Sequence, residues 1–394
     1  MNHTLLGLIY FMAFSHSLML AISLWHRSAK QSSGRWLALL TLIVSYKLFE
    51  GGALYTGLYP FLAHSMDLLP GEILVIGPLL YIYSIVVVGK RPARSALVSC
   101  HFIPALAIWL FNSPAVFRGT DAKIAMWETV VTSSEGAPLP IYLVILLLGM
   151  KVHLSVYLYL SWREIRLFEH ASANLRSDNS QQVLANIKSL IAAFFVLEML
   201  WAGLFIGQQY FGLDSLTKVG EIWLLLVAAL MLGIGYIGLQ KPDLIFTKEE
   251  YTLAQSRADS NTQDKTDNIK YFHSALPMET AELLAKELEH HIQAKQLYLD
   301  DKLSLTDLAK ATGIKAHTLS QVINLTMKTS FYKLINTYRI QHAIELIDNP
   351  AMNWTLERIA YESGFTNRVT FSKAFKEVMQ CTPSAYKKEK VRVS

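Results

Sequence analysis

Long apolar segments alternate with short polar ones through the first 240 residues of the 394-residue chain. A helix needs ~20 mainly apolar residues to cross a bilayer. The pattern therefore predicts a transmembrane domain over 1–240 that is a bundle of seven helices. The predicted spans are 4–25, 36–58, 69–89, 95–112, 139–161, 188–208 and 220–239.

Two of these segments are counted as membrane spans for specific reasons. The first apolar run has no Lys or Arg before it, and His26 and Arg27 follow it, so it is interpreted as a retained helix and not as a signal peptide. The span 95–112 is short and contains His101 and Pro104. It is kept because an even number of crossings would put the two ends of the domain on the same side.

Positive residues flank the spans unevenly. Loops 26–35, 90–94 and 162–187 carry nine Lys and Arg residues, whereas loops 59–68, 113–138 and 209–219 carry three. Because Lys and Arg collect on the cytoplasmic side, the N-terminus is expected outside and the C-terminal region in the cytoplasm. The expected location is the bacterial cytoplasmic (inner) membrane, with the lipid bilayer as a partner.

Composition changes after residue 240. The whole chain is 52% hydrophobic and only 17% charged, against about 25% charged residues in soluble proteins, and the deficit lies in the first 240 residues. Residues 241–275 are predicted to be a cytoplasmic linker, and 276–394 a separate domain. Cys100 and Cys381 fall on either side of this boundary, which argues against a disulfide.

The last domain has an amphipathic helical pattern. Leu305 and Ala309 belong to one apolar stripe, and Gly313 follows where a chain must turn between two helices. Ser304 or Thr306 could cap the first of these helices. The apolar face then continues through a second helix, so this region predicts a helix-turn-helix.

The same arrangement recurs about 51 residues later. Ala309 and Gly313 are four residues apart, as are Ala360 and Gly364. Residues 331–347 between the two copies are predicted to form one helix of roughly 25 Å. That length suits two recognition helices reading successive major grooves, ~34 Å apart on one DNA face. The expected fold class is thus all-α, with an all-helical double helix-turn-helix domain after the bundle.

Residues 280–390 resemble the DNA-binding domain of AraC/XylS-type transcription regulators. The residues that carry the resemblance are Leu305-Thr306-Asp307-Leu308-Ala309, Leu319-Ser320-Gln321, Ser330-Phe331, Tyr338-Arg339-Ile340, Ala343, Ile359-Ala360, Gly364-Phe365, Phe371-Ser372-Lys373-Ala374-Phe375-Lys376 and Thr382-Pro383-Ser384-Ala385-Tyr386. Family members usually carry a soluble sensing domain, so the membrane domain departs from the family pattern. Lys328 and Gln380 also stand where many members have Gly, which suggests a different backbone geometry at those turns.

The resemblance implies recognition helices near 316–324 and 368–378. It points to base contacts by His317, Ser320, Gln321, Arg368, Thr370 and Lys373. Gln can bond adenine, and Arg or Lys can bond guanine. Phosphate contacts are expected from Lys315, Lys376, Lys387 and Lys388. The implied partner is double-stranded DNA, an operator with two major-groove contacts per chain, and a homodimer would double the half-sites.

Ionisable residues also fall inside the predicted spans. The candidates for an intramembrane site are Lys47, Glu50, Lys151, His153 and Glu198, and Glu72 and Glu221 lie near the outer ends of their spans. A charge at bilayer depth costs at least ~2.5–3.5 kcal/mol, so these groups should face the bundle interior. Lys47 and Glu50 are three apart and share a helix face, so they can pair. Two interpretations stay open: a cavity for an unknown small-molecule or membrane signal, or ion pairs that only fix helix packing.

The main functional hypothesis is a membrane-embedded, sequence-specific transcription regulator that senses a signal through its bundle. The alternative is a transporter or channel-like protein with a regulatory DNA-binding tail. The absence of visible internal repeats argues against common transporter plans. No nucleophile elbow, phosphate loop, kinase motif or metal motif is present in the sequence. We therefore expect no enzyme activity, no catalytic residues, no metal and no cofactor.

Overall fold

A computed structural model describes residues 3–28, 33–90, 95–125, 141–172, 175–176, 180–211, 246–254, 277–349, 352 and 354–393, together with single positions between 223 and 239. The chain divides into two compact units. The first comprises Met1–Arg166 and Ala185–Phe246, and the second comprises Leu167–Leu184 and Thr247–Ser394. Every regular element among the described residues is a helix, as the all-α fold class predicts.

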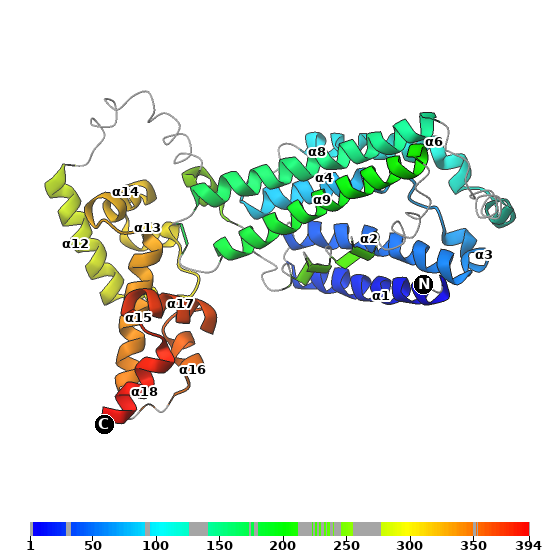
Figure 1. Cartoon of the computed structure of the whole chain (residues 1–394). Helices are drawn as coiled ribbons and strands as arrows, with labels where there is room; N and C mark the ends of the chain where they lie inside the picture. The colour runs from blue at the N-terminus through cyan, green and yellow to red at the C-terminus, as the bar shows by residue number, and fades with distance from the viewer. Residues whose placement is uncertain are drawn as a thin grey trace. The chain divides into compact units, whose positions relative to one another are not determined.

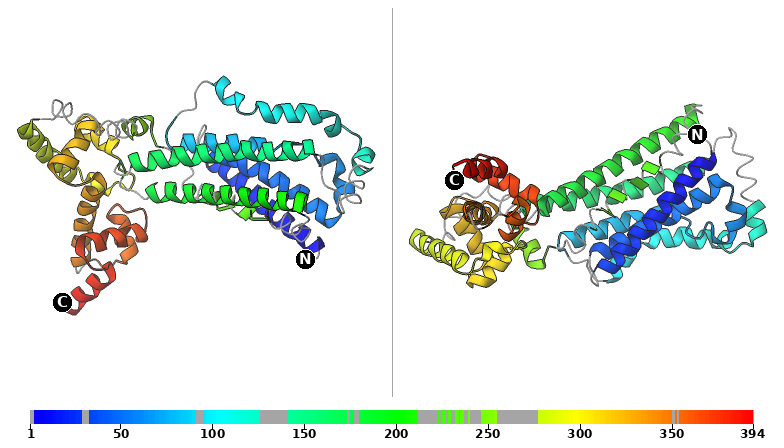
Figure 2. Two further views of the ribbon diagram at one scale, coloured as in Figure 1. Left: turned by 45° about the horizontal axis from the view of Figure 1, so that its top comes forward. Right: turned by 90° about the horizontal axis from the view of Figure 1, so that it is seen from below.

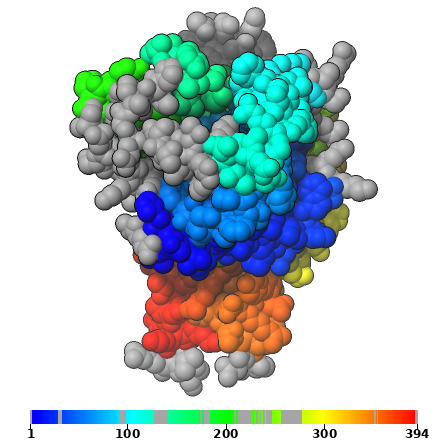
Figure 3. Space-filling model, turned by 90° about the vertical axis from the view of Figure 1, so that its right-hand side faces the viewer, coloured from blue at the N-terminus to red at the C-terminus, as the bar shows by residue number. Residues whose placement is uncertain are grey.

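Long helices that run side by side form the first unit (Figures 1 and 2). The long ones are α1 (His3–Arg27), α2 (Ser33–Thr56), α4 (Ile73–Val87), α8 (Ile141–Ala171) and α9 (Ser180–Phe211). The shorter ones are α3 (Tyr59–Leu62), η1 (Ala63–Ser65), α5 (Ser95–Cys100) and α6 (Ile103–Val116). Figure 3 views the end of this unit where α3 and α6 lie.

Small residues let α1 and α2 pack closely. A Cβ on Gly7 would lie 2.5 Å from Thr56 Cγ2, and one on Gly52 would lie 2.8 Å from the Phe11 ring. Such close approach of backbones is typical of helix pairs in membranes, where packing and not water exclusion drives association.

Four helices are long and apolar enough to cross a membrane: His3–Arg27, Ser33–Thr56, Ile141–Glu169 and Val183–Gly207. Ile73–Val87 and Ile103–Val116 are apolar but shorter. Only 22% of the residues in the most apolar windows of α8 and α9 are buried. Large apolar side chains such as Met12, Ile145 and Val196 are more than 60% exposed. A surface of this kind is suited to lipid and not to water.

Some predicted boundaries differ from the structure. The span 95–112 is broken at His101 and Phe102 into α5 and α6, because Pro104 in the first turn of α6 has no N–H to continue a preceding helix. The loop predicted at 162–187 is shorter in the structure, because α8 extends to Ala171 and α9 begins at Ser180. The ends of both helices there are rich in polar residues that follow or precede the apolar parts. The span 220–239 lies largely outside the described residues.

The second unit contains two helix-turn-helix pairs joined by one helix (Figure 1). Its elements are α12 (Met278–Ala294), η4 (Leu297–Leu299), α13 (Leu305–Thr312), α14 (Ala316–Gln321), a π-helical turn η5 (Val322–Thr326), α15 (Phe331–Asp348), α16 (Leu356–Glu362), α17 (Arg368–Met379) and α18 (Pro383–Val393). Residues 248–254 of the predicted linker are also helical.

Side-chain caps fix where these helices begin. Ser304 and Asp307 form a capping box at α13, which decides between the two predicted caps in favour of Ser304. Ser330, Thr355 and Asn367 accept hydrogen bonds from backbone N–H groups at the starts of α15, α16 and α17. Each such cap stabilises a helix by about 1 kcal/mol.

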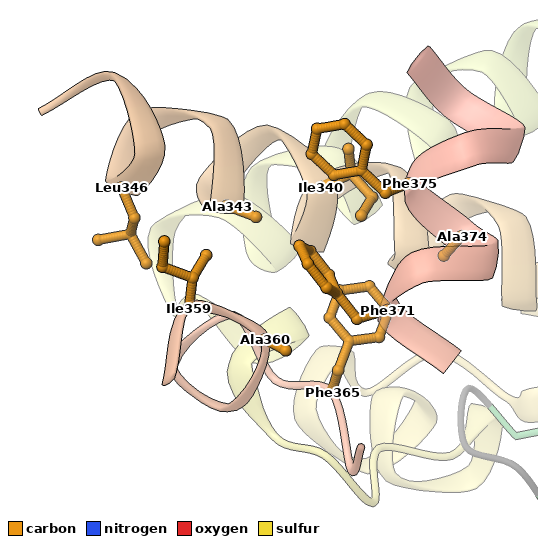
Figure 4. Close-up of a cluster of buried hydrophobic side chains, with 9 residues drawn as sticks. All are labelled: Ile340, Ala343, Leu346, Ile359, Ala360, Phe365, Phe371, Ala374 and Phe375. Carbon is orange, nitrogen blue, oxygen red and sulfur yellow. The ribbon is translucent and has the colours of Figure 1, made fainter. Parts of the chain in front are cut away.

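The second helix-turn-helix packs around aromatic rings (Figure 4). Phe365, Phe371 and Phe375 are fully buried together with Ile340 from α15 and Ile359 from α16. Neighbouring Phe rings meet at steep interplanar angles of 63° and 69°, the edge-to-face arrangement that aromatic pairs prefer. This core holds α17 against α15.

Arg339 lies in the middle of α15 and is 1% exposed. Its guanidinium donates to the carbonyl oxygens of Tyr298 and Asp300, both at 2.7 Å, and lies 5.5 Å from the Phe365 ring centroid. A buried guanidinium without such acceptors would be strongly destabilising. Arg339 therefore ties the connecting helix to the segment before α13.

Lys328 and Gln380 adopt the left-handed conformation, with φ of 50° and 58°. The suggested change of geometry at these turns is wrong: the turns keep the conformation that Gly favours and place an L-residue in it. That conformation costs an L-residue roughly 1–2 kcal/mol.

We predict that Gly364→Ala lowers the free energy of unfolding of the second unit by about 2–4 kcal/mol. Gly364 has φ of +82°, and a Cβ there would lie 2.5 Å from the Tyr298 carbonyl oxygen. Gly313→Ala is the matched control, because Gly313 has φ of +73° but open space around it. The control should cost only about 1 kcal/mol. Hydrogen exchange of the full chain measures both, and equal losses would contradict the close approach.

We also predict that Gln380→Gly raises the free energy of unfolding of this unit by about 0.5–1 kcal/mol, because Gly relieves the left-handed strain. Lys376→Gly, one turn earlier inside α17, should instead lower it by about 1 kcal/mol. The same exchange measurement compares the two, and a loss of stability in Gln380→Gly would show that the turn is unstrained.

Candidate functional sites: a DNA-reading surface and a membrane cavity

The first candidate recognition helix is α14 with its continuation η5. Lys315 and His317 are exposed at its start, and Gln321 is half-buried at its end. Ser320 is only 8% exposed, and its hydroxyl accepts a hydrogen bond from the Asn324 amide at 3.3 Å. Lys315, His317 and Gln321 are thus accessible to DNA, whereas Ser320 holds the helix to its own continuation.

The second candidate recognition helix, α17, presents Arg368 and Lys373 to solvent. Asn367 caps this helix by accepting from Thr370 N at 2.9 Å, and the Thr370 hydroxyl donates to the same oxygen at 3.1 Å. Thr370 therefore stabilises the start of α17, while Arg368 and Lys373 are accessible to a partner.

Sequence reasoning missed two exposed apolar side chains on these helices. Val369 on α17 is 80% exposed, and Leu325 in η5 is 73% exposed. An apolar side chain on a recognition helix can contact the methyl group of thymine. The sequence signal for Val369 is an apolar residue that lies off the helix face formed by Phe371, Ala374 and Phe375.

The predicted phosphate-contacting lysines fall into two groups. Lys376 lines a groove of about 840 Å³ between α15 and α17, together with Lys333 and with Lys373, which was predicted to contact a base. Burial raises the pKa of Tyr332 in the same groove, so its hydroxyl stays protonated and can donate. Lys388 is exposed, but Lys387 Nζ donates to the Trp354 carbonyl at 2.5 Å and so holds α18 to the preceding loop.

A cavity of about 720 Å³ lies among the helices of the first unit. It gathers four of the five predicted intramembrane residues: Lys47, Glu50, Lys151 and Glu198. The Lys47 ammonium lies 3.2 Å from Glu50 and 3.2 Å from Glu72, which confirms the predicted pairing on α2. One wall is a fixed loop, because Asp67 N donates to Glu50 Oε1 at 2.9 Å.

Lys151 and Glu198 form the buried pair of this cavity. The Lys151 ammonium donates to Glu198 Oε2 at 2.8 Å, and the two side chains are 8% and 0% exposed. The ammonium also lies 4.2 Å from the ring centroids of Trp201 and Trp223. Opposite charge and aromatic faces together compensate the lost hydration of the lysine.

His153 lies elsewhere. Its ring is 4.9 Å from that of Tyr157, whose hydroxyl is 2.8 Å from His101 Nδ1. The structure therefore does not bring His153 to the cavity with the other four residues. Among the residues that the structure describes, no group of three or more His, Cys, Asp or Glu side chains could hold a metal ion.

A third polar site lies in the second unit, where the loop after α8 meets the residues after Phe246. Arg176 donates twice to Glu250, with Nε to Oε1 at 2.8 Å and Nη2 to Oε2 at 2.9 Å. Glu250 is fully buried. Nearby, the rings of Phe168 and Tyr251 stack at 6.2 Å. We call Phe168, Leu175, Arg176, Glu250 and Tyr251 the junction cluster.

The junction cluster contacts the first helix-turn-helix directly. Leu305 N donates to the Leu175 carbonyl at 2.9 Å, and Arg176 forms an isolated antiparallel bridge with Ser304. Ser304 is the residue that caps α13. The loop after α8 is thus hydrogen-bonded to the starting point of the first helix-turn-helix.

The sequence contains a local signal for this cluster inside the predicted linker. Thr247 and Glu250 have capping-box spacing, and Thr247 N donates to Glu250 Oε2 at 2.7 Å while Glu250 N donates to the Thr247 hydroxyl at 3.2 Å. Arg176, 74 positions before Glu250, had no local pattern to mark it.

The C-terminal region is similar in sequence to known proteins. Residues 308–389 match a family model described as a helix-turn-helix domain. An uncharacterized HTH-type transcriptional regulator of Staphylococcus aureus (strain COL) is 27% identical over 99 residues, which are 25% of this chain and 13% of that protein. The uncharacterized HTH-type transcriptional regulator YdeC of Bacillus subtilis (strain 168) is 28% identical over 92 residues, 23% of this chain and 31% of that protein. No solved structure matches.

The chain thus spans less than a third of the length of each of these relatives. The residues matched by the family model all lie in the second unit. Their names agree with the prediction of a DNA-binding regulator and not an enzyme. The C-terminal region of this chain contains a helix-turn-helix domain similar to those of HTH-type transcriptional regulators, and such a domain implies DNA as its partner.

Proposed function

We propose that this protein is a membrane-embedded transcription regulator. In this proposal the first unit crosses the bacterial cytoplasmic membrane seven times, with the N-terminus outside. The double helix-turn-helix of AraC/XylS type reads an operator from the cytoplasmic side, and a second copy of the chain binds the neighbouring half-sites. The membrane helices sense a signal and change how the DNA-binding domain engages DNA.

The junction cluster is the observation that carries this proposal. A DNA-binding domain that was merely tethered would need no fixed contact with the loop between two apolar helices. Here that loop pairs with Ser304 and Leu305 and is held by a bidentate, buried ion pair. Such pairs have strict geometry, so in this proposal a signal that moves the loop changes the stability of α13.

The base-reading prediction is tested by genome-wide mapping of the sites that the full chain occupies. A good bidentate base contact contributes ~1–3 kcal/mol, so Gln321→Ala combined with Arg368→Ala should abolish most specific sites. Gln341→Ala combined with Arg358→Ala removes the same residue types from exposed positions on α15 and α16, and it should leave the sites occupied. Retention of all sites by the first double variant would show that the recognition helices are assigned wrongly.

The coupling prediction is tested with a double-mutant cycle on Arg176 and Glu250. Removing one partner of a buried ion pair costs about 3–5 kcal/mol. We therefore expect each Ala variant to destabilise α13 by hydrogen exchange, with a strong coupling energy between the two, and to change promoter occupancy by the full chain. The matched pair Arg358–Glu362 is 3.7 Å apart and more than half exposed on the Arg358 side. Its coupling should stay below about 0.5 kcal/mol.

Promoter occupancy distinguishes coupling from simple packing. If the Arg176→Ala chain is destabilised at α13 but occupies its sites as the unchanged chain does, the junction cluster has only a structural role and the sensing part of the proposal loses its support.

A further inference from the structure

The cavity in the first unit has the size of a small-molecule site. Its volume of about 720 Å³ lies within the roughly 300–1,000 Å³ of typical ligand pockets. Much of its wall is apolar or aromatic, with Tyr10, Tyr55 and Phe194 beside aliphatic side chains such as Leu154. The rings of Tyr10 and Tyr55 stack on each other at 5.4 Å with an interplanar angle of 8°.

The charges around the cavity are unbalanced. Its described lining holds the carboxylates of Glu50, Asp67, Glu72 and Glu198 but only the ammonium groups of Lys47 and Lys151. Both ammonium groups already contact carboxylates, at 3.2 Å for Lys47 and 2.8 Å for Lys151. An anionic ligand would therefore find its two cations engaged and excess negative charge around it.

One carboxylate oxygen of the lining has no hydrogen-bond donor. Glu198 is 0% exposed, its Oε2 binds Lys151, and its Oε1 has no hydrogen-bond partner. Buried carboxylate oxygens normally accept hydrogen bonds, and an unsatisfied one is costly. The indole Nε1 of Trp223, which also lines the cavity, is likewise buried without a partner. The indole N–H is a donor and needs an acceptor, so only Glu198 Oε1 can accept a hydrogen bond from a donating ligand group, beside rings that already hold one ammonium.

We infer that the cavity binds an organic ammonium ion with an apolar or aromatic body. The ammonium group donates to Glu198 Oε1 and balances the excess carboxylate charge, and the body lies against the Tyr10 and Tyr55 side of the wall. Cation recognition by carboxylate and aromatic faces together is a general mode for such ligands. That this ligand is the regulator's signal rests on the proposed function; that the cavity binds it does not.

The test compares three probes of one shape and different charge on the purified full chain in nanodiscs: phenethylammonium, 2-phenylethanol and phenylacetate. Binding is followed by intrinsic tryptophan fluorescence, because Trp201 and Trp223 line the cavity, and by thermal stability. We expect saturable binding of the ammonium, binding at least about tenfold weaker for the alcohol, and none for the anion.

Two variants locate the site. Glu198→Gln should weaken phenethylammonium binding at least about tenfold. Glu72→Gln, whose side chain is partly exposed, removes another carboxylate without breaking the buried pair and should also weaken it, which covers the case in which Glu198→Gln does not fold. The control is Glu164→Gln, because Glu164 pairs with Lys90 at 3.3 Å outside the cavity lining. It should bind the probe as the unchanged chain does.

Tighter binding of phenylacetate, no saturable binding of the ammonium, or equal weakening by Glu164→Gln would each overturn the inference. Promoter occupancy separates this inference from the proposed function. If the ammonium binds and occupancy does not change, the cavity site stands and the sensing role fails for this class of ligand. If Gln321→Ala with Arg368→Ala abolishes occupancy while no ammonium binds, the regulator stands and the cavity assignment fails.

Discussion

A charge buried away from water must be compensated where it lies, and this constraint organises both units. Three cations in the described residues show it: Lys151, Arg176 and Arg339. Each meets its acceptors at 2.7 to 2.9 Å, and two of the three also lie near aromatic rings. Because breaking such a site is far more costly than breaking a surface pair, each cation fixes the elements that supply its acceptors.

In the second unit these contacts form a continuous path. Arg176 holds the loop after α8 to Glu250, and the same loop pairs with Ser304 and Leu305 at the start of α13. Asp300, four residues before Ser304, accepts from Arg339 on the connecting helix. Arg339 in turn lies against Phe365 in the second helix-turn-helix. A displacement at the loop therefore has packed neighbours to act through in both helix-turn-helix pairs.

How far the sequence predicted these features depends on how local their signals are. Caps, the turn at Gly313 and the apolar spacing of α13 to α17 are encoded within a few residues, so the helices of the DNA-binding domain were predicted closely. The Lys47–Glu50 pair was predicted because its members are three positions apart on one helix. Lys151 and Glu198 were both expected to face the interior, but their pairing spans 47 positions and only packing of α8 on α9 decides it. Arg176 and Glu250 are even farther apart, at 74 positions, and the polar residues around Glu250 led to its assignment to the linker.

The same constraint also distinguishes the cavity from the other two sites. Arg339 and the Arg176–Glu250 pair are enclosed by protein groups, and they lie where a fixed geometry is needed. Lys151 is equally well paired, yet its carboxylate partner retains an unused oxygen, and the surrounding wall holds more carboxylates than cations. Glu50 and Glu72 pair with Lys47, and Asp67 accepts from the Tyr59 hydroxyl, so packing accounts for these three carboxylates. Packing does not account for Glu198 Oε1, which has no donor. The unused oxygen of Glu198 and the net negative charge of the lining are thus better explained by a cation that enters the cavity than by helix packing.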